Sequence, residues 1–568
     1  MSESHSADAG LALESLEVGA HPLIGALLER LQLRELLQRA LPTSSRRMKL
    51  AAVDSALVMI RNFALCRHPL YGVPEWVRRF VPSELGLERE QVQLVNDDRL
   101  GRTLDKLFDA DRRSVVTALI VHIAQEFNLD LQRLHNDTTS ITFCGDYPER
   151  APRPGRGRPV HITHGYNKDH RPDLKQLVWS LTVTEDGAVP VHYNVFDGNV
   201  TDDKIHIETW KALRKVVGRA DFLYVADSKL CTRENMAFVA SQQGRFITVL
   251  PRTRKEDARF KTWLVDHAPE WLPIWTRPAL RRQSDPPERF EAIEDPQLSV
   301  ESYRIVWYRS SEKWARDERT RDNAIHQARA ALHELGERVG RGKLKTRKQV
   351  QQAVDTILEE TAARAWVRVE LLARERHTYR QSRPGRPGKN TRYVRQSTTV
   401  YEPLVTLDTQ AIEAAAAADG IFPLVTNLEP EAMSALELLT TYKYQAFVEK
   451  RHEQLKTVTE VAPVNYKSPE RIEAFLFLYF IAITVHALLE RQVRKAMKAN
   501  DIPSIPLYPE ERACRAPTAD KVLGLFDNLR RHRLIDRGQH IKTFWDELSD
   551  VQRLVLDLLR IPTNAYGQ

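Results

Sequence analysis

Hydrophobic residues recur every three or four positions through the first quarter of the chain. Residues 22–41 (PLIGALLERLQLRELLQRAL) space their leucines in this way, and residues 47–66 (RMKLAAVDSALVMIRNFALC) repeat the pattern. The later stretches NDDRLGRTLDKLF and DRRSVVTALIVHIAQEFN each begin with an Asn or Asp that can cap a helix. The pattern predicts a compact helical domain over residues 21–128, preceded by a disordered polar tail, residues 1–20. Such a domain serves either as a scaffold or dimerisation unit or as a reader of DNA ends.

From residue 129 the apolar period changes to that of β-strands. LQRLHNDTTSITF is rich in β-branched residues, and LKQLVWSLTVTEDGAVPVHYNVFDG predicts a hairpin that turns at Glu185, Asp186 and Gly187. DFLYVADSKL predicts a short buried strand that ends in an acid, and two helical stretches separate these strands. The order predicts an α/β domain whose sheet begins with an antiparallel hairpin.

This α/β pattern is interrupted and then resumes. The interruption contains a β-like stretch, two highly charged helices (about 312–339 and 346–363) and a hairpin around a Pro/Gly/Arg loop, before a Gly-led strand, DGIFPLVTN. We therefore expect a mixed, largely β insertion within a divided core, followed by a C-terminal helical segment. The predicted domains are the core, residues 129–251 and 411–500, the insertion, 252–410, and the C-terminal segment, 501–568.

The longest apolar run extends from Ala474 to Leu489 and includes Thr484 and His486. It is too short and too polar to cross a bilayer easily, so it predicts a buried core helix.

The net charge favours one class of binding partner, and the cysteine pattern favours one cellular compartment. The chain carries 84 Lys and Arg against 76 Asp and Glu, a net charge of +8, which favours a polyanionic partner. Its 4 cysteines lie far apart without CxxC spacing. Together with an N-terminus that lacks a secretion signal, this pattern predicts a reduced, cytoplasmic location, in association with the nucleoid.

Three acids are candidates for catalysis. Asp137 lies at the end of the first predicted strand and Asp227 ends the later one, and Glu449 lies in TYKYQAFVEKRHEQLKTV, which predicts one helix over residues 441–458. We expect the three carboxylates to meet at one edge of the sheet, where strand ends gather functional groups. Hard oxygen ligands suit Mg²⁺ or Mn²⁺, and two such ions support in-line phosphoryl transfer. The alternative for each acid taken alone is a turn or cap residue.

The same helix carries a polar face. Tyr442, Glu449 and Lys456 recur every seven residues, and Gln445 lies one turn before Glu449, so all four share a face if the helix is continuous. A solvated stripe is the structural alternative. In the functional interpretation, Glu449 binds a metal ion, and Tyr442 and Lys456 bind DNA phosphates.

The motifs resemble those of DDE transposases of bacterial insertion sequences, in the branch with the signature Y-(2)-R-(3)-E-(6)-K. Here the signature consists of Tyr442, Gln445, Glu449 and Lys456, with Gln in the Arg position. Arg451 is a neighbouring cation that could compensate for the missing Arg. The resemblance covers roughly residues 130–500 through, in order, HNDTTSITF, GYNKDHRPDLKQLVWSLTV, FDGNVTD, VADSKL and DGIFPLVTN.

The resemblance implies an RNase H-like catalytic domain with two metal ions. By it, Asp137 would contact both ions, Asp227 and Glu449 would each hold one, and Tyr442, Gln445, Lys456 and Arg451 would bind DNA. The implied reaction is nicking at the terminal inverted repeats of a transposon and strand transfer into target DNA, by a homodimer that holds two ends. The alternatives are an RNase H-like nuclease without joining activity and an inactive repressor that binds DNA ends.

Two basic loops are further candidates for DNA contact. Residues 147–175 hold seven Lys and Arg against three acids, with Pro and Gly that keep the segment open. Residues 380–395 form the Pro/Gly/Arg loop of the predicted hairpin. Both can follow a phosphate backbone, and a solvated loop is the alternative for the second.

Overall fold

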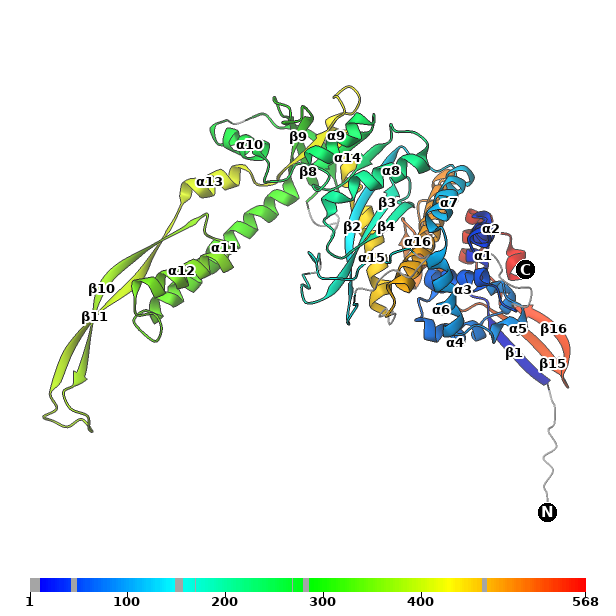
Figure 1. The fold of residues 1–568 in the computed structure, drawn as a ribbon, viewed down its shortest axis with the longest axis horizontal. Helices are drawn as coiled ribbons and strands as arrows, with labels where there is room; N and C mark the ends of the chain where they lie inside the picture. Colours follow the sequence, from blue (N-terminus) through cyan, green and yellow to red (C-terminus); the bar gives the residue numbers. More distant parts are fainter. Residues whose placement is uncertain are drawn as a thin grey trace, which may run out of the picture. The chain divides into compact units, whose positions relative to one another are not determined.

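The computed structural model describes residues 11–41, 49–148, 157–168, 170–267, 269–278, 286–461 and 467–567. The chain forms two compact units (Figure 1). The first unit comprises residues 1–248 and 439–568, and the second comprises residues 249–438. The chain therefore leaves the first unit and returns to it.

The first unit is built on a sheet in which strand order differs from chain order. Its strands lie in the order β4-β3-β2-β5-β6. β2 pairs antiparallel with β3, and β3 with β4, whereas β5 pairs parallel with β2 and β6 parallel with β5. An antiparallel meander extended by parallel strands on its first strand is the RNase H-like arrangement, which confirms the predicted fold class. The strands are β2 (Arg133–Phe143), β3 (Lys175–Thr184), β4 (Pro190–Phe196), β5 (Leu223–Val225) and β6 (Arg245–Val249).

The β3–β4 hairpin turns where the sequence predicts. Gly187 has φ 88°, a left-handed conformation that favours glycine. A Cβ atom there would also lie 2.9 Å from the side chain of Arg491. The Arg491 guanidinium donates to the carbonyls of Phe127 and Asn128, both at 3.0 Å, and pairs with Asp186. The turn is thus fixed by a residue three hundred positions further along the chain.

Helix α16 (Pro469–Ala499) forms the centre of the first unit. It packs against α3, α6, α18 and strand β4. By length and composition it could span a membrane, but 94% of its most apolar window is buried inside the unit. The two polar residues of its apolar run have internal partners, because Thr484 donates to the Phe480 carbonyl (2.8 Å) and His486 Nε2 lies 2.7 Å from the Ala64 carbonyl. The prediction of a buried core helix is confirmed.

The N-terminal helices belong to this unit. As predicted, Asn96 caps α6 through a bond from the Arg99 amide, and Asp111 caps α7 through a bond from the Ser114 amide. The helices are α1 (His21–Arg30), α2 (Leu33–Ala40), α3 (Ala52–Leu65), α4 (Val73–Arg79), α5 (Arg89–Val92), α6 (Asp97–Asp109) and α7 (Arg112–Glu126). The remaining helices of the unit are α8 (His206–Val217), α9 (Arg233–Ser241), α15 (Ala446–Val461), α17 (Ala519–Gly524) and α18 (Asp550–Leu559).

The two ends of the chain correct the sequence prediction. Within the predicted disordered tail, β1 (Leu11–Glu17) is a strand that pairs antiparallel with β15 (Arg530–Asp536), and β15 pairs with β16 (Gln539–Trp545). Residues 1–10 lie outside the described residues. The C-terminal segment is helical only in part. Besides β15 and β16, it holds the short antiparallel pair β13 (Ile505–Pro506) and β14 (Ala513–Cys514). Acids of β1 lie opposite arginines of β15, in the pairs Glu14↔Arg533 and Glu17↔Arg530. Local sequence patterns do not predict these pairs, because the two strands come from opposite ends of the chain.

The second unit combines an antiparallel sheet, two long helices and a long hairpin. Its sheet has the order β12-β9-β8-β7. The two charged helices and the hairpin appear where the sequence predicts them, and α11 is 28 residues long. The elements are α10 (Lys255–Asp266), β7 (Leu272–Arg277), β8 (Glu288–Glu294), β9 (Arg304–Ser310), α11 (Ser311–Arg338), α12 (Arg347–Glu360), β10 (Val367–Gln381), β11 (Tyr393–Leu407), α13 (Thr409–Ala417) and β12 (Ile421–Thr426). Along the chain, α14 (Ala435–Lys443) leads back to the first unit.

Candidate active site

Two of the predicted acids come from neighbouring parallel strands. β2 and β5 pair in register up to His135↔Val225. Asp137 and Asp227 each lie two residues beyond this pair, and β2 continues to Phe143 only in its pairing with β3. The point where β5 ends therefore leaves both carboxylates at one edge of the parallel pair. The Asp227 turn is fixed by the Lys229 amide, which donates to Asp227 Oδ1 (3.0 Å), and by Thr248, which donates to the Asp227 carbonyl (2.6 Å).

The helix predicted over residues 441–458 is two helices. α14 ends at Lys443, α15 begins at Ala446, and a turn separates them. Tyr442 therefore belongs to the last turn of α14, whereas Glu449 belongs to the first turn of α15. The seven-residue spacing does not describe one continuous helical face, which corrects the sequence prediction.

Gln445 forms the turn between the two helices. Its amide nitrogen donates to the Asn136 carbonyl at 2.6 Å, and its Oε1 lies 3.3 Å from His135 Nδ1. Its side chain is buried. These contacts hold the start of α15 against β2 next to Asp137, so the predicted DNA contact of Gln445 is corrected to an internal one.

Arg451 is also used inside the unit. Its guanidinium pairs with Glu490 of α16 at 2.9 Å, and both side chains are 5% exposed. It also donates to the carbonyl of Ala188 at 3.1 Å, in the β3–β4 turn. The predicted DNA contact of Arg451 is therefore corrected as well, since no charge is left for a phosphate.

Tyr442 lies within the electrostatic field of all three acids. Burial, followed by Asp227, Asp137 and Glu449, raises the pKa of its phenol above the usual range. Lys456 is half-buried on α15, where its charge acts on His452. The structure thus leaves DNA contact by Tyr442 and Lys456 as a prediction.

Asp227 and Glu449 both act on Asp137. Burial raises the pKa of Asp137 to about 7, with the negative charges of Asp227 and Glu449 contributing to the rise and Lys168 opposing it. Burial also raises the pKa of Asp227, with Asp202 adding to the rise. Residues from β2, from the turn after β5 and from α15 thus share one region of negative potential.

Lys168 is a member of this site that the sequence analysis did not single out. Its ammonium donates to the Thr138 carbonyl (2.6 Å) and hydroxyl (2.7 Å). It lies 3.3 Å from a carboxylate oxygen of Asp202 and 3.8 Å from one of Asp137. Both new residues fall within quoted motifs, Lys168 in GYNKDH and Asp202 in FDGNVTD, which was the available signal.

His452 is the second unpredicted member. It follows Glu449 by three residues on α15, and its Nε2 lies 3.6 Å from Asp137 Oδ2. Burial lowers its pKa to about 3, with Lys168 and Lys456 contributing, so its ring is neutral at pH 7. Among the described residues, neither ring nitrogen has a hydrogen-bond partner. The ring therefore keeps unused polar atoms beside the central carboxylate.

The ligand types at this site fit a hard divalent cation. The three predicted ligands are carboxylates, and their mutual charges raise the pKa of Asp137, so a bound cation would relieve repulsion. Within the described ranges, no three His, Cys, Asp or Glu side chains yet converge closely enough to hold an ion. The ammonium of Lys168, 3.8 Å from Asp137, partly offsets the negative charge of the site.

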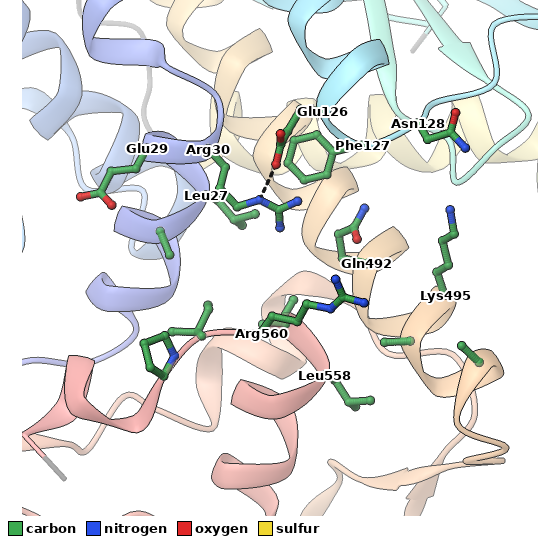
Figure 2. A pocket seen from close by; sticks show the side chains of 16 residues that line it. Leu27, Glu29, Arg30, Glu126, Phe127, Asn128, Gln492, Lys495, Leu558 and Arg560 are labelled. Atoms are coloured by element: carbon green, nitrogen blue, oxygen red, sulfur yellow. Dashed lines mark hydrogen bonds and ion pairs between the residues drawn. The ribbon is translucent and has the colours of Figure 1, made fainter.

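Two other candidate features are the basic loop that contains Lys168 and a cavity. Of the basic loop over residues 147–175, residues 149–156 and 169 are outside the described residues. A cavity of about 680 Å³ opens between α1, the end of α7, α16 and α18 (Figure 2). Arg30 on its wall pairs with Glu126 at 2.9 Å. None of the predicted site residues lines this cavity.

The sequence matches two protein families. Residues 13–121 match a family described as a domain of unknown function (DUF4277), and residues 134–485 match the family described as transposase DDE domain. No curated protein matches the sequence.

Two transposase complexes are among the solved structures that the comparison matched to this chain. A piggyBac transposase synaptic complex with hairpin DNA is 10% identical, with a TM-score of 0.24, over 84% of this chain and 82% of that one. A Mos1 mariner paired-end complex with Mn is 10% identical, with a TM-score of 0.14, over 39% of this chain and 76% of that one.

An RNase H-like sheet with acids gathered at the end of its parallel strands defines the class of DDE phosphoryl-transfer proteins. The family match covers more than half of the chain, so the chain belongs to the transposase DDE domain family. It is a DNA transposase, and the family as a whole uses divalent metal ions.

Proposed function

We propose that this transposase cleaves DNA at the ends of its element and joins the freed 3′-hydroxyl to target DNA, using two Mg²⁺ or Mn²⁺ ions. Asp137, Asp227 and Glu449 are the proposed ligands. One observation carries the proposal: acids from three separate elements of one unit lie close enough that Asp227 and Glu449 raise the pKa of Asp137, and all three raise the pKa of Tyr442. Perturbed pKa values of this kind gather at functional sites.

The residues around the acids have distinct roles in this proposal. Bound divalent ions would supply charge neutralisation and an activated oxygen nucleophile. Lys168 holds the Asp137 and Asp202 carboxylates in place through the Thr138 backbone. Gln445 holds the first turn of α15, which carries Glu449, against β2. Tyr442 and Lys456 bind the DNA backbone near the reacting phosphate.

The proposed substrate is double-stranded DNA, namely the terminal inverted repeats and the target. The protein acts as a homodimer, because two ends must be held together for concerted joining. The proposed place of action is the cytoplasm, at the nucleoid. The second candidate is an RNase H-like nuclease that cuts without joining, since the same acids would serve both reactions.

The test is cleavage and joining of a labelled duplex that carries the sequences flanking the gene, with Mg²⁺. Glu449→Gln should abolish both reactions and preserve DNA binding. Glu453→Gln, one turn further along α15, is the matched control and should retain activity. Equal cleavage by wild type and Glu449→Gln contradicts the ligand assignment.

Product analysis separates the candidate functions. Joined products from the wild type support transposition, whereas nicked products alone support the nuclease. DNA binding without any cleavage supports a repressor that binds ends. Titration of Mn²⁺ into wild type and Asp137→Asn by calorimetry tests the metal site without relying on catalysis.

A further inference from the structure

The hairpin of the second unit has a supported base and an unsupported outer half. β10 and β11 pair in unbroken antiparallel register from Val367↔Leu407 to Gln381↔Tyr393. At the base, Val367 and Leu371 are buried in a cluster with apolar residues of α11 and α12. Among residues 374–399, by contrast, no side chain is buried. Figure 1 shows the hairpin extending past the ends of these two helices.

The charged residues of the outer half are almost all cations. Residues 376–395 contain no Asp or Glu, and their cations are Arg376, Arg380, Arg383, Arg386, Lys389, Arg392 and Arg395. The hairpin acids, Glu370, Glu375 and Glu402, all lie nearer the base. A two-stranded ribbon without a packed face gains little stability by itself. Repulsion among the cations lowers that stability further, so a contribution to folding does not explain why this stretch is so basic.

A second basic group lies beside the ribbon. The turn between α11 and α12 carries a run of exposed cations without an acid, namely Arg338, Arg341, Lys343, Lys345, Arg347 and Lys348. Arg376 of β10 donates to the Val339 carbonyl at 3.1 Å, and Gly340 packs closely against Val400 of β11. The turn and the ribbon thus adjoin within one unit. Together they form the basic ribbon surface, defined as residues 338–348 and 376–395.

The geometry of the basic ribbon surface matches duplex DNA. The six residues 376–381 of β10 extend roughly 20 Å at about 3.3 Å per residue, a little over half a turn of B-DNA, and the loop lies beyond them. A two-stranded ribbon is also narrow enough for the major groove. Tyr379 and Tyr393, which are 66% and 51% exposed, add hydroxyl donors. Tyr379 pairs with Arg395 across the ribbon, so one face presents both phenol and guanidinium groups.

We propose that the basic ribbon surface binds the backbone of duplex DNA. It contributes affinity that does not depend on base sequence and takes no part in the chemical step. The inference rests on the function as a DNA transposase and specifies a second, separate DNA-binding region. Its cations work by charge complementarity with phosphates, which releases counterions from the DNA.

The test compares two triple variants of the full chain. Arg380→Gln/Arg386→Gln/Arg392→Gln removes three cations from the ribbon. Arg316→Gln/Arg319→Gln/Arg329→Gln removes three exposed cations from the mixed-charge helix α11 and is the matched control. Binding to a duplex of unrelated sequence is measured across a salt series. Each lost phosphate contact lowers the slope of log K against log salt by about 0.9, so the ribbon variant should lose about 2 to 3 in slope.

Two results would overturn the inference. The first is a ribbon variant with the wild-type salt slope, or a control variant with an equal loss. The second is a ribbon variant that fails to cleave at low salt with saturating DNA, because the ribbon would then take part in the chemistry. If the wild type itself does not cleave, the proposed reaction fails, but the salt slopes still decide the role of the ribbon.

Discussion

Two antiparallel hairpins of this protein, β3–β4 and β10–β11, lie in opposite environments. In the β3–β4 hairpin, every β3 residue from Gln176 to Thr184 is buried, and the turn is held by Arg451 and Arg491. In β10–β11, the outer half buries no side chain and carries a row of arginines. Arginine is thus an internal brace in one hairpin and a solvent-exposed charge in the other. The hairpins differ in what packs on them. The β3–β4 hairpin lies in a packed core, which fixes its geometry, whereas the outer half of β10–β11 is exposed and available to a binding partner.

The sharpest test of this contrast is Asp137→Asn in β2, the partner strand of β3. Cleavage should fall by about a thousandfold or more, because several kcal/mol of transition-state stabilisation depend on the proposed metal ligand. Thermal stability without metal should not fall, since burial already raises the pKa of this carboxyl to about 7. Single-turnover cleavage and thermal melts check both. A large drop in melting temperature would instead give Asp137 a structural role.

Arg451→Ala should destabilise the first unit by about 3–5 kcal/mol, because Glu490 is then left buried without its partner. Denaturant unfolding measures the change. The control is Arg171→Ala, which removes an exposed ion pair with Asp173 and should leave the free energy of unfolding almost unchanged. Similar losses in both variants would show that burial does not distinguish these arginines.

Within the second hairpin, base and outer half should respond differently. Leu371→Ala should cost about 2–3 kcal/mol, since it opens a cavity in the cluster with α11 and α12. Tyr379→Ala, in the exposed half, should change the free energy of unfolding by less than about 0.5 kcal/mol. An equally large effect at Tyr379 would reveal packing on the outer ribbon.

The smallest effect concerns acid stability. Burial lowers the pKa of His21 to about 3 and that of His206 to about 4, below the ordinary value of 6.5. The unfolded chain therefore binds more protons below pH 6.5, and each histidine removes up to about 1.4 kcal/mol of stability per pH unit as the pH falls towards its folded pKa. His21→Phe, which keeps ring packing against Phe80, should flatten this dependence between pH 6.5 and 5. An unchanged slope in denaturant unfolding would contradict the assignment.

Local patterns predicted much of this molecule. The helix caps at Asn96 and Asp111, the turn at Gly187, the buried α16 and the charged helices of the second unit depend on residues a few positions apart. The motif order was enough to indicate the family. These features were readable because capping, turn formation and periodicity act between near neighbours.

The site required the tertiary structure. The sequence supplied Asp137, Asp227 and Glu449 as candidates, but not the counter-charge of Lys168 or the neutral ring of His452. It also predicted that Gln445 and Arg451 bind DNA, although both side chains are buried and bond to Asn136 and Glu490. A polar residue looks the same in sequence whether it faces water or a buried partner. Burial depends on segments that lie 39 residues away for Glu490 and 309 residues away for Asn136, so only the assembled fold determines which charges remain available to DNA.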